Sequence, residues 1–399
     1  MSKSIGDAEP LSAALKQIVN GTPVEGTRAW VIGGVLAETK NRQLDLVSAL
    51  VAGEDGDTAI SILLAAPFDP LTWGVARSLG PELEARYWKE IAPGWSRSED
   101  DVRYAVRKLV EAGRPRAAFQ FAHFELKELQ PRDLFNLLDA IRVGGDEAEG
   151  TYQLDPHYLR DAFKLLNASD QMSTDEMAGL EFAFVDIFDE NQDLEMVSLG
   201  KQIEEHPELF VQAVSYVFKR SDDGEDPTEP ELSDEQKDAR GHLCYKMLEN
   251  LTIIPGHDEN GDLKADRLVN WVEQARAGFA DVARSDVGDR RIGQLLSRAP
   301  AADDDVWPCL PVRDALELLT NEQLEQGLYV AMRNSRGAHW RGEGGAQERT
   351  IAAKYAGWAK AMNYTHPRVA AFLRDLEDSY LREADWEDNE AKISRRMRY

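Results

Sequence analysis

The feature that most restricts the fold is a series of short helical patterns separated by turn signals. In the segment 321–332, the apolar residues Leu324, Leu328 and Ala331 are spaced so that they lie on one face of a helix. The segment 346–362 repeats this spacing with larger side chains. No stretch of the chain shows a recurring alternation of apolar and polar residues, which a half-buried strand requires. These patterns together predict an all-α fold.

The turn signals follow one another closely, so the predicted helices are short. Pro81 opens one helix, which ends before Pro93-Gly94, and Gly113-Arg114-Pro115 interrupts another. Helices of this length cannot bury their apolar faces alone and must stack in pairs. We therefore predict stacked helical hairpins, an α-solenoid-like fold comparable to HEAT or TPR arrays but without a regular repeat period. The residues 111–118 (EAGRPRAA) resemble the turn inside tetratricopeptide-like hairpins.

Composition divides the chain into four predicted parts. The segment from Ser221 to Asp238 contains nine acidic residues, two prolines and one lysine, which is typical of a solvated, mobile loop between helices. The predicted parts are an N-terminal helical-hairpin module (1–145), a central helical module (146–221), an acidic loop (222–238) and a C-terminal helical module with a Gly/Arg-rich loop (239–399).

The charge of the chain restricts its partners. It has 46 Lys and Arg residues against 72 Asp and Glu residues, a net charge of −26. Such a surface repels nucleic acid and anionic membranes and favours basic partners. We therefore expect no general nucleic-acid binding and no membrane association. The chain also lacks an apolar run long enough to span a bilayer and a secretory signal pattern, and it has two cysteines, Cys244 and Cys309. These features predict a cytoplasmic protein.

The segment 333–349 is the main candidate for a binding site. It contains four arginines and four glycines between two predicted helices. Glycines permit close backbone approach, and arginines bind carboxylates or phosphates in pairs of hydrogen bonds. One interpretation is a loop that recognises an anion or a partner protein; the other is a structural loop whose arginines pair with the chain's own carboxylates. Because exposed tryptophans beside arginines are typical of interfaces, the candidate residues are Arg333, Arg336, His339, Trp340, Arg341, Glu343, Arg349 and Trp307.

Sequence patterns for a reactive centre are mostly absent. The chain has no phosphate-binding loop, zinc motif or nucleophile elbow. The segments 258–262 and 189–193 are acidic, but neither has a carboxylate at the twelfth position of a calcium loop, so both are predicted to be simple acidic turns. Cys309 and His339 flank one predicted hairpin, but a buried apolar role is favoured for Cys309. We expect no metal, no cofactor and no catalytic residue.

The last quarter of the chain carries a family resemblance. Residues 307–311 (WPCLP), 336–345 (RGAHWRGEGG) and 386–392 (WEDNEAK) resemble the C-terminal region of uncharacterised bacterial helical-repeat proteins. This resemblance implies a bacterial cytoplasmic protein and assigns no catalytic residue.

The function expected from these observations is a non-catalytic scaffold, adaptor or sensor that binds another protein, alone or within a larger assembly. Two alternatives stay open. One is a hydrolase- or transferase-type enzyme that acts on an anionic substrate through His339, Glu343 or Glu348 and the neighbouring arginines. The other is local recognition of nucleic acid by the arginine loop and the basic tail 392–399.

Overall fold

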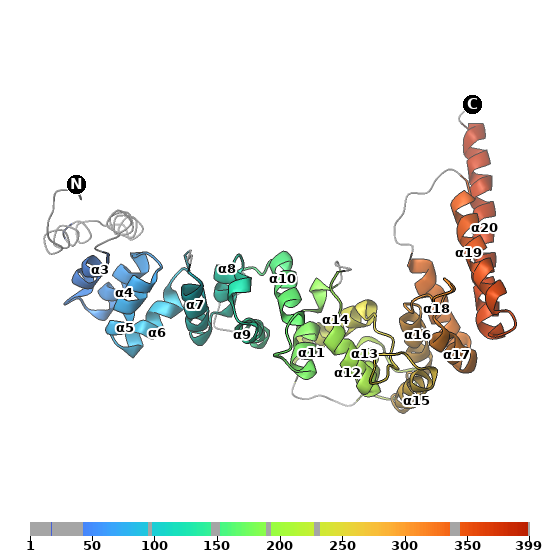
Figure 1. Cartoon of the computed structure of the whole chain (residues 1–399), viewed down its shortest axis with the longest axis horizontal. Helices are drawn as coiled ribbons and strands as arrows, with labels where there is room; N and C mark the ends of the chain where they lie inside the picture. The colour runs from blue at the N-terminus through green and yellow to red at the C-terminus, as the bar shows by residue number, and fades with distance from the viewer. Residues whose placement is uncertain are drawn as a thin grey trace. The chain divides into compact units, whose positions relative to one another are not determined.

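The computed structural model confirms the all-α class (Figure 1). The regular elements of the described residues are helices. In the same residues, one isolated antiparallel β-bridge joins His257 and Leu263. The sequence pattern predicts a helix over residues 11–19 and either a helix or a buried strand over residues 28–39, and both segments lie outside the described residues, except for Gln17. The structure describes Gln17 and residues 43–94, 98–144, 152–188, 193–226, 232–335 and 344–397.

The contacts of the chain divide it into two compact units, Met1–Met172 and Ser173–Tyr399. This division lies between the module boundaries predicted at 145 and at 221. The helices that the described residues of the first unit form are α3 (Gln43–Val51), α4 (Gly56–Ala65), α5 (Pro70–Ser78), α6 (Pro81–Glu90), α7 (Glu99–Glu111), α8 (Pro115–Ala122), the 3-10 helix η3 (Leu126–Glu128), α9 (Pro131–Val143) and α10 (Pro156–Asn167).

Local sequence signals account for most helix starts in the first unit. Helices α5, α6, α8, α9 and α10 each have a proline in the first turn, where its missing N–H has no helical partner to lose. Ser98 directly precedes α7, but its side chain makes no capping hydrogen bond. Helix α7 buries Val102, Ala105, Val106 and Leu109, which are spaced along one face. Each helix packs against the next one or two in the chain, as stacked hairpins require.

The second unit is also a stack of helical hairpins. Its principal packed pairs are α11 with α12, α13 with α14, α16 with α18, and α19 with α20, and α15 packs against α13 and α17. Figure 1 shows α19 and α20 side by side at the C-terminal end of the chain. The helices are α11 (Thr174–Ala183), the 3-10 helix η4 (Val185–Ile187), α12 (Val197–Glu205), α13 (Pro207–Val217), α14 (Asp234–Asn250), α15 (Ala265–Asp281), α16 (Ser285–Leu296), α17 (Leu310–Leu319), α18 (Glu322–Asn334), α19 (Ala346–Met362) and α20 (Pro367–Met397).

Side-chain caps and close helix packing fix the elements of the second unit. A capping box is present at the start of α11: the side chains of Ser173 and Glu176 each accept a hydrogen bond from the other residue's backbone N–H. Helices α16 and α18 cross at Gly293 and Gly327, where the backbones come into direct contact. A Cβ atom on Gly327 would lie 2.0 Å from the carbonyl oxygen of Arg290, so only glycine fits without a shift of one helix.

The predicted acidic loop is shorter than expected. Ser233 and Gln236 form a second capping box, and α14 begins at Asp234, so the last residues assigned to the loop are helical. The residues from Ser221 to Asp226 are exposed, as predicted.

Candidate functional site

A cleft with a volume of about 1030 Å³ lies among the described residues of the second unit. It lies between the C-terminal half of α12, the start of α13, the segment 253–261 and one face of α15. Most of its lining side chains are polar or charged. They are Thr174, Lys201, Glu204, Glu205, Pro207, Ile253, Gly256, His257, Asp258, Glu259, Gly261, Arg267, Asn270, Trp271 and Gln274.

Trp271 connects the two helices that form the walls of this cleft. Its side chain is 3 % exposed, and its indole Nε1 donates a hydrogen bond to the carbonyl oxygen of Ile203, 2.9 Å away. The indole ring also packs against Phe210, with 5.4 Å between ring centroids. Because the indole N–H is paired and the ring is buried, Trp271 holds α15 against α12 and α13.

Glu204 fixes the loop that forms another side of the cleft. Its Oε1 accepts hydrogen bonds from the backbone N–H groups of Gly256, at 2.7 Å, and of His257. The same oxygen lies 3.2 Å from Nδ1 of the His257 ring. Gly256 has a φ of +112°, and a Cβ there would lie 2.7 Å from the backbone nitrogen of Leu268. The loop therefore depends on the carboxylate of Glu204 and on the absence of a side chain at Gly256.

The acidic turn 258–262 closes the end of this loop. Asp258 Oδ1 accepts hydrogen bonds from the backbone N–H groups of Asn260 and Asp262, at 2.9 and 3.0 Å. These hydrogen bonds, with the ammonium of Lys264, lower the pKa of Asp258. The prediction of an acidic turn is confirmed here. In the described ranges, no three His, Cys, Asp or Glu side chains gather in a way that would hold a metal ion. Most of the turn predicted at 189–193 lies outside the described residues.

Several polar side chains point from these elements toward solvent at the cleft. Lys201, Glu205 and Glu259 are exposed and form no ion pair with any described residue. Arg267 donates one hydrogen bond to the carbonyl oxygen of His257, 3.0 Å away, and the residue is exposed. The cleft-lining amides on α15 are exposed as well, and they are Asn270 and Gln274. The cleft thus combines a rigid floor with polar groups that are open to a ligand.

Glu181 positions α12 from its other end. This side chain is fully buried, and its carboxylate accepts hydrogen bonds from the backbone N–H groups of Ser198 and Leu199, at 3.2 and 2.6 Å. It therefore caps the start of α12 from a neighbouring helix. Burial disfavours the charged form more than these hydrogen bonds favour it, which raises the pKa of Glu181 from 4.5 to about 7.

This raised pKa predicts a pH dependence of stability. Between pH 4.5 and about 7 the folded chain holds a proton on Glu181 that the unfolded chain has lost. The contribution to the free energy of unfolding is therefore complete below pH 4.5 and is lost as the pH rises through 7. We expect the free energy of unfolding of the wild type, measured by urea denaturation, to fall by up to about 3 kcal/mol between pH 4.5 and about 7. Glu181→Gln removes this fall; an unchanged pH profile in the variant would show that another group is responsible.

The structure describes three of the eight binding residues predicted from the sequence. Arg333 pairs with Glu383 at 2.7 Å, and its guanidinium lies 4.3 Å from the ring centroid of Tyr380. Arg349 pairs with Asp385 and Asp388, at 2.9 and 2.8 Å. Both arginines thus contact carboxylates of α20, which agrees with the interpretation of a structural loop whose arginines pair with the chain's own carboxylates. The other five lie outside the described residues: Arg336, His339, Trp340, Arg341 and Glu343.

Trp307 corrects the expectation of an exposed contact residue. Its side chain is 6 % exposed, and its indole Nε1 donates a hydrogen bond to the carbonyl oxygen of Ala299, 2.8 Å away. The irregular segment that contains Trp307 folds back on the helices because the buried Arg313 donates hydrogen bonds to the carbonyl oxygens of Val306 and Pro308. A segment without regular structure is therefore part of the core here. Burial also raises the pKa of the neighbouring Cys309, which disfavours its reactive thiolate form.

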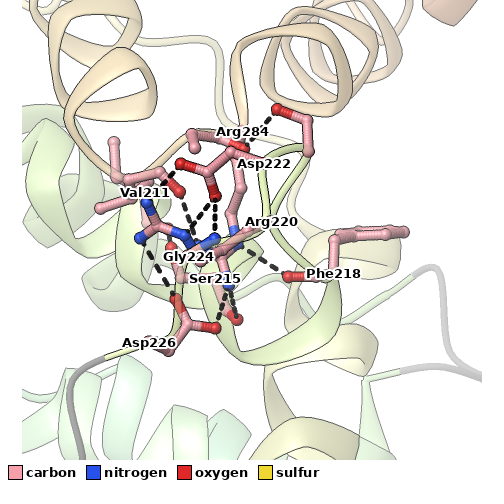
Figure 2. Close-up of polar contacts among 11 residues, drawn as sticks. Val211, Ser215, Phe218, Arg220, Asp222, Gly224, Asp226 and Arg284 are labelled. Atoms are coloured by element: carbon pink, nitrogen blue, oxygen red, sulfur yellow. Dashed lines mark hydrogen bonds and ion pairs between the residues drawn. The ribbon is translucent and has the colours of Figure 1, made fainter.

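The acidic segment has a buried anchor that the sequence did not indicate. Arg284 is 1 % exposed, and its guanidinium donates hydrogen bonds to the carbonyl oxygens of Phe218, Val282 and Ser215. Figure 2 shows the same guanidinium reaching Asp226, whose Oδ2 lies 2.5 Å from Nη2. The first part of the acidic segment is therefore tied to the end of α13 and the start of α16.

The fold and the cleft define a class of protein: an all-α stack of helical hairpins with a polar cleft in its second unit. No family model matches the chain, and the searches of curated proteins and of solved structures give no match. None of the helices in the described ranges combines the length and the apolar character that crossing a membrane requires.

Proposed function

We propose that this chain is a non-catalytic helical-repeat scaffold or adaptor of the bacterial cytoplasm, and that its cleft between α12 and α15 binds another protein. The bacterial and cytoplasmic parts of the proposal rest on the resemblance of the last quarter of the chain and on its two cysteines. The protein-binding part rests on the geometry of the second unit.

The open polar groups of the cleft are the observation that carries the proposal. Side chains that form a binding site must be held in place, and their polar ends must be free to pair with the ligand. Trp271 and Glu204 supply the rigid frame, and the two exposed amides of α15 lie on its wall. The lining also includes His257, but its ring is paired with Glu204, and Thr174 is the one hydroxyl side chain among the described residues that line the cleft. This arrangement supports binding better than nucleophilic catalysis.

Photo-cross-linking in cells of the organism that produces this protein tests the proposal. A photoreactive amino acid at Gln274 or at Asn270 is expected to capture the same partner protein, because both side chains face the cleft. The matched control is Glu273, which is exposed on the same helix but does not line the cleft. The captured protein is then purified, and its binding to the intact chain and to an Asn270→Ala/Gln274→Ala variant is measured.

Four outcomes separate the possible functions. A partner that is captured from Gln274 and Asn270 but not from Glu273, and that binds the Asn270→Ala/Gln274→Ala variant at least about tenfold more weakly, supports the proposal. Equal capture from all three positions contradicts it. If the Arg336→Ala/Trp340→Ala double variant no longer binds the partner, the arginine loop is the contact instead of the cleft. If the arginine loop captures nucleic acid, the alternative of local nucleic-acid recognition is favoured.

A further inference from the structure

The spacing of two amide side chains in the cleft indicates the shape of its ligand. Asn270 and Gln274 lie four residues apart on the exposed, cleft-facing side of α15. Four residues advance a helix by about 6 Å. In an extended chain, the backbone groups that face one side repeat every two residues, or about 6.6 Å. Each primary amide both donates and accepts hydrogen bonds, as a peptide group does. The pair therefore matches one edge of an extended peptide that runs along α15.

The charges of the cleft indicate the sign of the charge that the peptide carries. The whole chain carries a net charge of −26, which attracts cationic segments over long range. Of the charged lining residues, Glu205 and Glu259 are exposed carboxylates without an ion pair among the described residues. Carboxylates outnumber cationic side chains in the described lining, with Glu204, Glu205, Asp258 and Glu259 against Lys201 and Arg267.

The other charged side chains of the cleft already interact with groups of the chain itself. Glu204 and Asp258 hold the loop through backbone N–H groups, and Arg267 donates to the carbonyl oxygen of His257. Lys201 lies one helical turn before Glu205 on α12 and offsets part of its charge. The two carboxylates at Glu205 and Glu259 are therefore the groups that a ligand can engage without breaking the frame of the site.

We infer that the cleft binds an extended, basic segment of the partner protein. The backbone of this segment pairs with the side-chain amides of Asn270 and Gln274, and its Lys or Arg side chains pair with Glu205 and Glu259. This inference rests on the proposed function, since it names the part of the partner that the cleft recognises.

Fluorescence anisotropy of labelled peptides with the full chain tests the inference. The probes are a short peptide of alternating lysine and threonine, the same peptide with glutamate in place of lysine, and the lysine peptide with N-methyl groups on alternate backbone nitrogens. The lysine peptide is expected to bind best. N-methylation or Asn270→Ala/Gln274→Ala is expected to weaken it at least about tenfold, because both remove the backbone hydrogen bonds and leave every charge in place.

The control variant separates recognition by the cleft from general attraction to an acidic protein. Glu205→Gln/Glu259→Gln removes two lining carboxylates, whereas Glu273→Gln/Asp266→Asn removes two exposed carboxylates of α15 that do not line the cleft. We expect the first pair to weaken the lysine peptide by at least about tenfold and the second pair to change its affinity less than about twofold. Equal losses from both pairs, or tighter binding of the glutamate peptide, overturn the inference.

The two proposals can fail separately. If the lysine peptide does not bind but Gln274 cross-links a partner, the cleft is a binding site for a different kind of segment and only the inference falls. If Gln274 and Asn270 capture no partner and no peptide binds, both proposals fall.

Discussion

Replacing Gly327 by alanine is expected to lower the free energy of unfolding of the second unit by about 3 kcal/mol. The new methyl carbon would lie 2.0 Å from the carbonyl oxygen of Arg290 and 2.7 Å from its carbonyl carbon. Both atoms belong to the backbone of α16, so no side-chain rotation relieves the overlap, and α16 and α18 must move apart. The reciprocal change Gly293→Ala has the same consequence, because its Cβ would lie 2.2 Å from the carbonyl oxygen of Leu324.

Urea unfolding followed by circular dichroism measures this effect against a matched control. Gly357 lies in α19, and no neighbouring atom comes within 4 Å of the position that a Cβ would occupy, so Gly357→Ala adds a methyl group into open space. Alanine is the better helix former, and this control is expected to raise the free energy of unfolding by roughly 0.5–1 kcal/mol. If Gly327→Ala shifts the midpoint no further downward than Gly357→Ala does, the two helices do not pack as closely as the structure shows.

Replacing Arg284 by alanine is expected to cost about 3 kcal/mol. The guanidinium is buried and donates to three carbonyl oxygens, those of Phe218, Val282 and Ser215, at 2.7, 2.7 and 3.3 Å. Without it these acceptors lose their donor, and the exposed Asp226 loses the ion pair that lowers its pKa. Arg284→Lys keeps the charge but not the planar set of donors, so it is expected to recover only a small part of the stability.

Arg220 supplies the control for this second prediction. It pairs with Asp222 through two hydrogen bonds of 2.7 and 2.9 Å, but its carboxylate partners are exposed. Exposed ion pairs contribute little, so Arg220→Ala is expected to cost less than about 1 kcal/mol. Thermal and urea unfolding of both variants, with limited proteolysis after Lys219, compare them. Equal destabilisation by the two changes would contradict a special role for the buried arginine.

Much of the fold was predictable because its signals are local. The prolines at 81, 156 and 207, the capping box at Ser173 and the helical spacing from 346 to 362 all depend on residues within one or two turns. The predicted binding loop was a different case: its two described arginines, Arg333 and Arg349, contact carboxylates of α20 that lie far away in the sequence.

The cleft could not be predicted from its own residues. Glu204, His257 and Gln274 lie in separate segments, and no motif or spacing connects them. The turn 258–262 was noticed for its acidic residues, but what matters for the cleft is that Glu204 reaches the backbone next to it. A hydrogen bond between residues about fifty positions apart leaves no periodic trace in a sequence.

The order of residues along the chain was enough to establish helices, their approximate ends and their stacking in pairs, because periodicity, caps and turns act over a few residues. Which side chains became buried depended on the packing of distant segments. That packing placed Trp307 and Arg284 inside, where Trp307 had been expected outside, and left Asn270 and Gln274 open to solvent. Burial depends on neighbours that the folded chain brings together, and the surface available for binding is what this packing leaves uncovered.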